Sequence, residues 1–141
     1  MKKVSVIYWS GTGNTEEMAN LIAKGAQENG SEVKLIPVGN AKIEDVVNSD
    51  ILLLGSPSMG SETIEESEME PFVESIKDSV KDKTVGLFGS YDWGDGEWMR
   101  NWVERMGSYG VNIFEEGCIV NLFPEGEEAN KCMDYGRRIV E

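Results

Sequence analysis

One segment near the start of the chain restricts its fold more than any other. It begins with Val4-Ser5-Val6-Ile7-Tyr8-Trp9, which reads as a buried strand because it is apolar and rich in β-branched residues. It continues directly into Ser10-Gly11-Thr12-Gly13-Asn14-Thr15, a turn of glycines and small polar residues, and a helix begins at Asn14 or Thr15. A strand that turns immediately into a helix is typical of an α/β fold built on a parallel sheet.

The same corner is suited to hold a phosphate group. Backbone N–H groups and hydroxyls converge on a ligand there, and the helix dipole favours negative charge. No Lys or Arg stands between Lys3 and Lys24, so the neutral donors favour a terminal phosphomonoester over the triphosphate of a lysine-containing P-loop. Glu16 stands where a dinucleotide fingerprint needs its third glycine. The alternative, that Gly11 and Gly13 only form a tight turn, explains the neighbouring hydroxyls and asparagine less well.

Strand and helix patterns alternate along the rest of the chain. The first helix stops at Gly30, and further strands are predicted at residues 33–38, 51–54, 85–88 and 111–120, the last bent around residues 115–117. Further helices are predicted at residues 43–47, from Pro71 at the first helical position through Val80, at 98–106 and at 129–140. This alternation predicts one domain over residues 1–141, a three-layer α/β/α sandwich around a five-stranded parallel sheet.

The net charge of −13, from 26 acidic and 13 basic residues, narrows the possible partners. Binding to nucleic acid or to an anionic membrane relies on Lys and Arg, so both are excluded as expected functions. An acidic protein attracts basic partners, although the same charge also serves solubility alone. No apolar run is long enough for a membrane span or a signal peptide, so we expect a cytoplasmic protein.

Histidine and cysteine usage limits the catalytic chemistry. The chain has no histidine, which excludes histidine-based triads and histidine–zinc sites, and we expect no metal site. Cys118 and Cys132 are far apart in the sequence. Two buried free thiols are the favoured interpretation, and a disulfide or redox pair is the alternative.

Three predicted loops follow the strands at the edge where such sheets bind ligands. The first is the phosphate corner, and the others are Ser56-Pro57-Ser58-Met59-Gly60-Ser61-Glu62 and Ser90-Tyr91-Asp92-Trp93-Gly94-Asp95-Gly96. Met59 and Trp93 suit the two faces of a flat ring, because a thioether and an indole both pack well on one. Taken alone, Met59 is better explained as filling a gap in the core, and Trp93 as plugging its own loop. Together with the phosphate corner, they favour a mononucleotide-like cofactor.

These motifs resemble the flavodoxin family, in particular its short-chain members from anaerobic bacteria. The resemblance spans the chain and rests on residues 8–16, on Leu87-Phe88-Gly89-Ser90-Tyr91 and on Trp93-Gly94-Asp95-Gly96. The predicted fifth strand lacks the long insertion of the long-chain type. The resemblance implies strand order 2-1-3-4-5 with non-covalent FMN where the order reverses, an arrangement for which flavodoxin is itself the standard example.

The resemblance also implies which residues bind FMN. They are Ser10, Gly11, Thr12, Gly13, Asn14, Thr15, Ser58, Met59, Gly60, Glu62, Ser90, Tyr91, Asp92, Trp93 and Gly94. The first six would hold the phosphate, Met59 would cover the inner face of the ring and Trp93 the outer face. The backbone of residues 92–94 would donate to the N1/O2 edge of the flavin, and Glu62 would accept from N3–H.

The peptide between Gly60 and Ser61 is expected to tune the redox chemistry. A carbonyl turned toward protonated flavin N5 would stabilise the neutral semiquinone, and this turn needs a positive φ, which glycine reaches cheaply. The many carboxylates disfavour the anionic hydroquinone, so its potential should be low. Asp92 stands where close relatives often have glycine, and Ser61 where some have Asp. Both differences from the family pattern affect the expected tuning of the redox potentials and not the identity of the cofactor.

The resemblance implies a low-potential carrier that shuttles single electrons between the semiquinone and hydroquinone states, and not an enzyme. As a monomer, it would dock transiently on basic patches of reductases and other oxidoreductases. The expected acidic rim comprises Glu62, Glu65, Glu66, Asp92, Asp95 and Glu97. One alternative is an FMN-dependent quinone reductase, but a Trp93 stacked on the ring would block its substrate. A second is a receiver-like signalling module, but this chain lacks the clustered aspartates that such a module needs. A third is a flavoprotein specialised for reductase maintenance.

Overall fold

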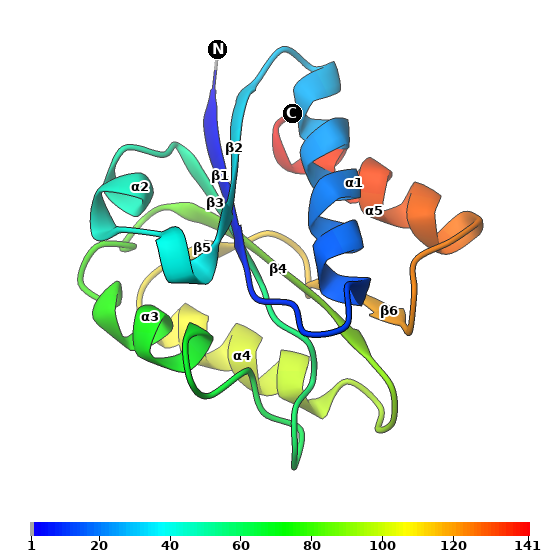
Figure 1. Cartoon of the computed structure of the whole chain (residues 1–141). Helices are drawn as coiled ribbons and strands as arrows, with labels where there is room; N and C mark the ends of the chain where they lie inside the picture. The colour runs from blue at the N-terminus through cyan, green and yellow to red at the C-terminus, as the bar shows by residue number, and fades with distance from the viewer. Residues whose placement is uncertain (1) are drawn as a thin grey trace.

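The computed structural model describes residues 2–141, in which a parallel sheet carries helices on both faces (Figure 1). The elements in chain order are β1 (Lys3–Tyr8), α1 (Asn14–Glu28), β2 (Glu32–Pro37), a 3-10 turn η1 (Val38–Asn40), α2 (Ile43–Val47), β3 (Ile51–Gly55), α3 (Met69–Ser75), β4 (Thr84–Tyr91), α4 (Glu97–Ser108), β5 (Asn112–Ile113), β6 (Cys118–Asn121) and α5 (Glu127–Ile139). The strand order is β2-β1-β3-β4-β5, with β6 also paired to β4. The predicted α/β/α sandwich of order 2-1-3-4-5 is confirmed.

The fifth position of the sheet holds two short strands in place of one. β5 pairs with the start of β4, where Asn112 lies opposite Thr84, and β6 pairs with its end, where Cys118 lies opposite Phe88. Between them the chain bulges at residues 115–117, where Glu115 and Gly117 both have positive φ angles, of 58° and 97°. The predicted bend is therefore confirmed, and it interrupts the pairing with β4.

Most elements differ from the prediction by one or two residues at an end, and β4 and α3 differ by more. β4 continues past Phe88 to Tyr91, because its last residues pair with β6. α3 begins at Met69 and ends at Ser75, so Pro71 lies in the first turn but not at its first residue, and Val80 is buried beyond the end of the helix. The longer β4 therefore includes Ser90 and Tyr91, the first two residues of the predicted third loop.

One face of the sheet is covered by α1 and α5, which pack backbone to backbone (Figure 1). A Cβ placed on Gly136 of α5 would stand 2.1 Å from the carbonyl oxygen of Ile22 in α1. A Cβ on Gly25 of α1 would stand 2.0 Å from the carbonyl oxygen of Met133 in α5. The two glycines therefore set the distance between the helices.

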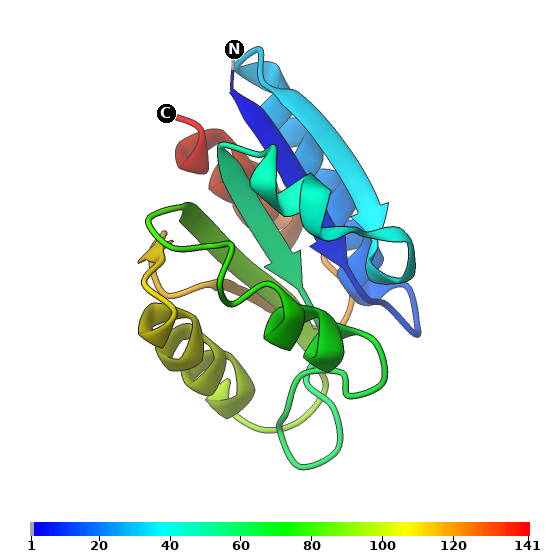
Figure 2. The ribbon, with the colours of Figure 1, turned by 90° about the vertical axis from the view of Figure 1, so that its left-hand side faces the viewer.

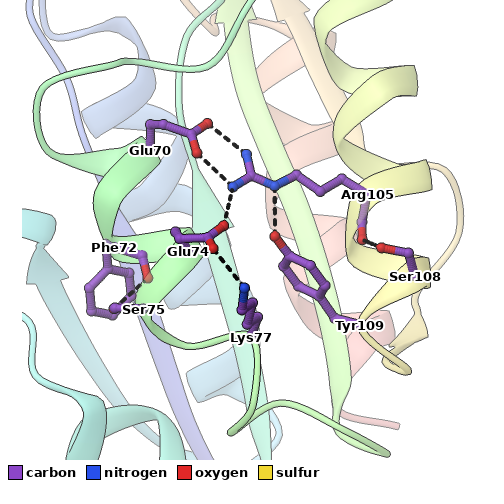
Figure 3. A network of polar contacts seen from close by, with 8 residues as sticks. All are labelled: Glu70, Phe72, Glu74, Ser75, Lys77, Arg105, Ser108 and Tyr109. Atoms are coloured by element: carbon purple, nitrogen blue, oxygen red, sulfur yellow. Dashed lines mark hydrogen bonds and ion pairs between the residues drawn. The ribbon is translucent and has the colours of Figure 1, made fainter.

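The opposite face is covered by α2, α3 and α4 (Figure 2). Here α4 buries the large indoles of Trp98 and Trp102 against the sheet. Arg105 of α4 reaches across to α3, where its two terminal nitrogens each lie 2.6 Å from a carboxylate oxygen of Glu70 and one lies 3.5 Å from Glu74 (Figure 3). The hydrogen bonds to Glu70 raise the pKa of Arg105 further above its ordinary value. Long side chains, and not helix backbones, make the contacts on this face.

Both cysteines are free and buried, as predicted. They are not isolated from each other, however: Cys118 on β6 and Cys132 on α5 belong to the same core, and hydrogen bonding with Cys132 lowers the pKa of the Cys118 thiol. Among residues 2–141, no helix has the length and apolar character needed to cross a membrane. Over the same residues, no group of three or more Cys, Asp or Glu side chains is placed to hold a metal ion.

Candidate functional site

The loops that follow β1, β3 and β4 meet at one edge of the sheet, the lower edge in Figure 1, and enclose a cavity of about 350 Å³. The structure brings together these predicted residues in its lining: Ser10, Gly11, Thr12, Asn14, Thr15, Ser58, Met59, Ser90, Tyr91 and Asp92. It adds Trp9, Pro57 and Leu122, which the sequence patterns did not single out as ligand contacts. The predicted residues Gly13, Gly60, Glu62, Trp93 and Gly94 lie outside the lining.

The phosphate corner is held open by its own hydrogen bonds. The hydroxyl oxygen of Ser10 accepts from the backbone N–H groups of Gly13, at 3.1 Å, and Glu16, at 3.2 Å. Gly13 precedes α1 with a φ of 97°, a left-handed conformation that strongly favours glycine. These contacts leave the Ser10 hydroxyl hydrogen to be donated into the cavity, beside the N-terminus of α1.

The indole of Trp9 supports the corner. A Cβ on Gly11 would stand only 3.0 Å from the Trp9 ring, so the loop backbone lies directly against the indole. The indole N–H donates to Glu68 at 3.1 Å, which fixes the ring from its far edge. Trp9 was assigned to the first strand, but β1 ends at Tyr8, and Trp9 instead forms part of the cavity wall.

The second loop is a narrow hairpin that begins at the cavity wall. The backbones of Met59 and Thr63 exchange two hydrogen bonds, of 2.8 and 3.0 Å, and so close a tip formed by residues 60–62. Gly60 at this tip has a φ of 47°, within the left-handed range that the expected peptide rotation requires, and it is exposed. Met59 is partly exposed and lines the cavity, so the alternative that it fills a core gap is wrong.

Glu62 connects the second loop to the third. Its carboxylate accepts from the backbone N–H of Glu97, the first residue of α4, at 3.2 Å. It also lies against Gly94, where a Cβ would stand 2.5 Å from the carboxylate oxygen. The predicted acceptor for a ring N–H therefore occupies the N-terminus of α4 in this structure.

The third loop leaves Trp93 exposed and Asp92 in the cavity lining. The Trp93 side chain is 60% exposed, so the alternative that it plugs its own loop is wrong. The start of the loop is held by buried Ser90, whose backbone N–H donates to the Thr15 hydroxyl at 3.4 Å and whose carbonyl accepts from Ser58 at 3.0 Å. All three loops thus meet at Ser90.

The expected acidic rim is only partly exposed. Glu65 is 4% exposed, and its carboxylate accepts from the N–H groups of Ser67, Glu68 and Met69 at 2.7–2.9 Å. Burial acts to raise the pKa of Glu65, but these bonds and one from the Ser67 hydroxyl outweigh it and lower the pKa. Assigning Glu65 to a docking rim was therefore wrong, because its charge is used to order the chain before α3. The other members of the predicted rim remain at least partly accessible.

The cavity has the chemistry that a mononucleotide with a flat ring requires. Among the described residues that line it, Asp92 carries the only charge and none is Lys or Arg. One end offers neutral donors at a helix N-terminus, which suits a terminal phosphate. Pro57, Met59 and Leu122 form an apolar wall, which suits the ring.

Comparisons with known proteins agree with this geometry. A sequence model of the family described as Flavodoxin matches residues 6–136. The flavodoxin of Clostridium beijerinckii is 49% identical over 137 residues, covering 97% of this chain and 99% of that protein. The flavodoxin of Megasphaera elsdenii is 43% identical over 133 residues, covering 94% and 95%. The solution structure of the two-electron reduced Megasphaera elsdenii flavodoxin has a TM-score of 0.87 at 41% identity, covering 96% of this chain and 98% of that one.

Proposed function

Because the chain belongs to the flavodoxin family, we propose that it binds FMN in the cavity between the three loops and carries single electrons between redox partner proteins. Membership of this family makes it a flavin-binding electron-transfer protein and not an enzyme with an organic substrate of its own. Bound FMN supplies the redox chemistry, because it accepts and releases electrons one at a time. The observation that supports FMN most strongly is the neutral phosphate corner, which shares one cavity with an apolar wall.

In this proposal the phosphate corner selects a monoester. Ser10, Thr12 and Thr15 offer hydroxyls, Asn14 offers its amide, and the N-terminus of α1 offers backbone N–H groups. A dianionic phosphate held by neutral donors keeps its charge near the ring. That charge disfavours further negative charge on the cofactor and lowers the potential for full reduction.

The ring loops have separate tasks. Met59, which lines the cavity, would cover the inner face of the ring, and exposed Trp93, the neighbour of the lining residue Asp92, would cover the outer face. Because Gly60 adopts a positive φ, the peptide between Gly60 and Ser61 could turn either its carbonyl or its N–H toward the ring, and the carbonyl would accept from a protonated ring nitrogen. Glu62, whose carboxylate accepts from the Glu97 N–H here, would be the acceptor for the ring N3–H.

The partners in this proposal are proteins with basic docking patches. Glu66, Asp92, Asp95 and Glu97 are exposed around the second and third loops and would attract such patches. Complexes of this kind are transient and weaken as salt screens the charges. We expect the protein to act as a monomer, which sedimentation of the FMN-bound protein tests.

The proposal is tested by adding FMN to the purified protein and reducing the complex stepwise without oxygen. We expect uptake of one FMN per chain and a stable blue one-electron-reduced state in the visible spectrum. Gly60→Ala should reduce the maximum yield of that state severalfold, because Ala strains the left-handed backbone that the peptide rotation requires.

Gly30→Ala is the matched control for that variant. Gly30 also has a positive φ, of 81°, and an added Cβ there meets no described atom within 4 Å, but it lies at the end of α1 far from the cavity loops. This variant should leave the blue state unchanged. A protein that takes up no FMN contradicts the proposal, and one that passes directly to full reduction favours a two-electron flavoenzyme.

A further inference from the structure

The last residue of β6, Asn121, and the next residue, Leu122, are tied to the third loop of the cavity. The side-chain amide of Asn121 donates to the carbonyl oxygens of Tyr91, at 3.0 Å, and Asp92, at 3.3 Å. The backbone N–H of Leu122 donates to the same Tyr91 carbonyl at 2.9 Å, and the Leu122 carbonyl accepts from the Ser90 hydroxyl at 2.6 Å. These bonds hold the loop where β4 ends.

Leu122 is held in a conformation that leucine rarely adopts. Its φ is 63°, in the left-handed range that is disfavoured for residues with a branched side chain. Burial in the core does not explain this strain, because the side chain is 48% exposed. Leu122 instead forms part of the cavity wall. Backbone strain of this kind persists where the surrounding contacts impose it, and such places are often ligand sites.

The bonds from Asn121 also set the direction of two N–H groups. The Tyr91 carbonyl belongs to the same planar peptide as the Asp92 N–H, and the Asp92 carbonyl to the same peptide as the Trp93 N–H. Fixing an oxygen of a trans peptide fixes its N–H in the opposite direction. The Asn121 amide therefore orients the Trp93 N–H and, together with the Leu122 N–H, the Asp92 N–H. Both of these N–H groups are donors expected for the ring edge.

We propose that Asn121 and Leu122 are positioning residues of the cofactor site: Asn121 aims the N–H groups of Asp92 and Trp93 at the ring of FMN, and Leu122 completes the cavity wall at the expense of backbone strain. This inference rests on the proposed function. It assigns a role in the site to a fourth segment, the end of β6 and the residue after it, beside the loops that follow β1, β3 and β4. Neither residue carries redox chemistry itself.

The first test compares Asn121→Ala and Asn121→Asp with Asn112→Ala. Asp has nearly the shape of Asn but lacks its donor. Asn112 is a matched control, because its amide donates to a backbone carbonyl, that of Asp82, at 3.1 Å and at the other end of β4. Both Asn121 variants should raise the dissociation constant of FMN about tenfold and shift the first reduction potential, while the FMN-free protein loses no more stability than it does in Asn112→Ala. Asn112→Ala should change neither the affinity nor the potential.

The second test is Leu122→Gly, which separates strain from cavity contact. Glycine adopts the left-handed conformation freely, so the FMN-free protein should be as stable as the wild type or more stable. Loss of the leucine side chain from the cavity wall should nevertheless raise the dissociation constant of FMN about fivefold. Wild-type affinity and potential in the Asn121 variants, or a less stable Leu122→Gly protein with unchanged affinity, overturns the inference. A wild-type protein that does not bind FMN contradicts the proposed function instead.

Discussion

The two faces of the sheet are covered in opposite ways. On one face, α1 and α5 approach so closely that Gly25 and Gly136 leave no room for a methyl group. On the other face, α4 meets the sheet and α3 through two buried tryptophans and the Arg105–Glu70 pair. The first contact depends on the absence of side chains and the second on their length, so the two faces should respond differently to the same kind of substitution.

This difference matters for the site, because each face carries part of it. The N-terminus of α1 forms the phosphate corner, whereas the hairpin tip and α4 are joined through Glu62 and Glu97. A close backbone contact cannot yield without moving a whole helix. Long polar side chains can reorient individually. The phosphate end of the cavity is therefore fixed by the more rigid of the two arrangements.

The largest effect is expected from Gly136→Ala in α5. The added methyl would overlap the Ile22 carbonyl of α1, so the free energy of unfolding should fall by about 3 kcal/mol despite the better helix propensity of alanine. Urea denaturation of the FMN-free protein measures this change.

The control on the opposite face is Gly107→Ala in α4. An added Cβ there meets no described atom within 4 Å, so helix propensity alone should act and stabilise the protein by roughly 0.5–1 kcal/mol. If both variants changed stability by similar amounts in the same direction, the contrast between the faces would not hold.

Glu65→Gln should have the next largest effect. Gln cannot replace a carboxylate that accepts from several N–H groups, so a loss of about 2 kcal/mol is expected at neutral pH. Because folding lowers the pKa of Glu65 below its ordinary value of 4.5, this stabilisation is complete above pH 4.5 and is lost as the pH falls through the folded-state pKa. Thermal unfolding of both proteins between pH 7 and pH 3 should show their stabilities converge; a constant difference would contradict the role of the charge.

Arg105→Met should have the smallest effect of the three. Met keeps much of the apolar stem and removes the partly exposed ion pair with Glu70, so the expected loss is about 1 kcal/mol at low salt and less at high salt. Lys77→Met, which removes an exposed pair with Glu74, is the control and should leave the unfolding midpoint unchanged. A loss in Arg105→Met that is independent of salt would indicate packing, and not charge, as the source.

Local pattern predicted most of the fold. The first strand, the corner and α1 follow from residue types whose preferences agree at every step, and α2 was predicted with its observed bounds of Ile43–Val47. The end of β4 was missed because Ser90 and Gly89 have weak strand preference and are held by pairing with β6. That pairing depends on residues 30 positions away, which no local pattern contains.

The site was predictable only in part for the same reason. The phosphate corner is contiguous in sequence, so its members appear together in one motif. Leu122 joins the lining through its bonds to Ser90 and Tyr91. The residues next to it in the sequence form no motif that predicts a ligand site. Glu65 was misassigned because it stands in a run of acidic residues, and only the fold shows that its carboxylate turns inward. The roles expected for Gly60, Glu62 and Trp93 toward a bound cofactor stay predictions.

The bridge between Met59 and Thr63 has a consequence for the rate of electron exchange. Because it closes the hairpin below Gly60, rotation of the peptide before Ser61 changes a few dihedral angles at the exposed tip and leaves the anchored base in place. Motions of such small loops take nanoseconds to microseconds, whereas rearrangements of whole domains take microseconds to milliseconds. The proposed rotation would therefore be complete within the lifetime of a typical docked complex, so the encounter with the partner, and not the loop, would limit the rate of electron exchange.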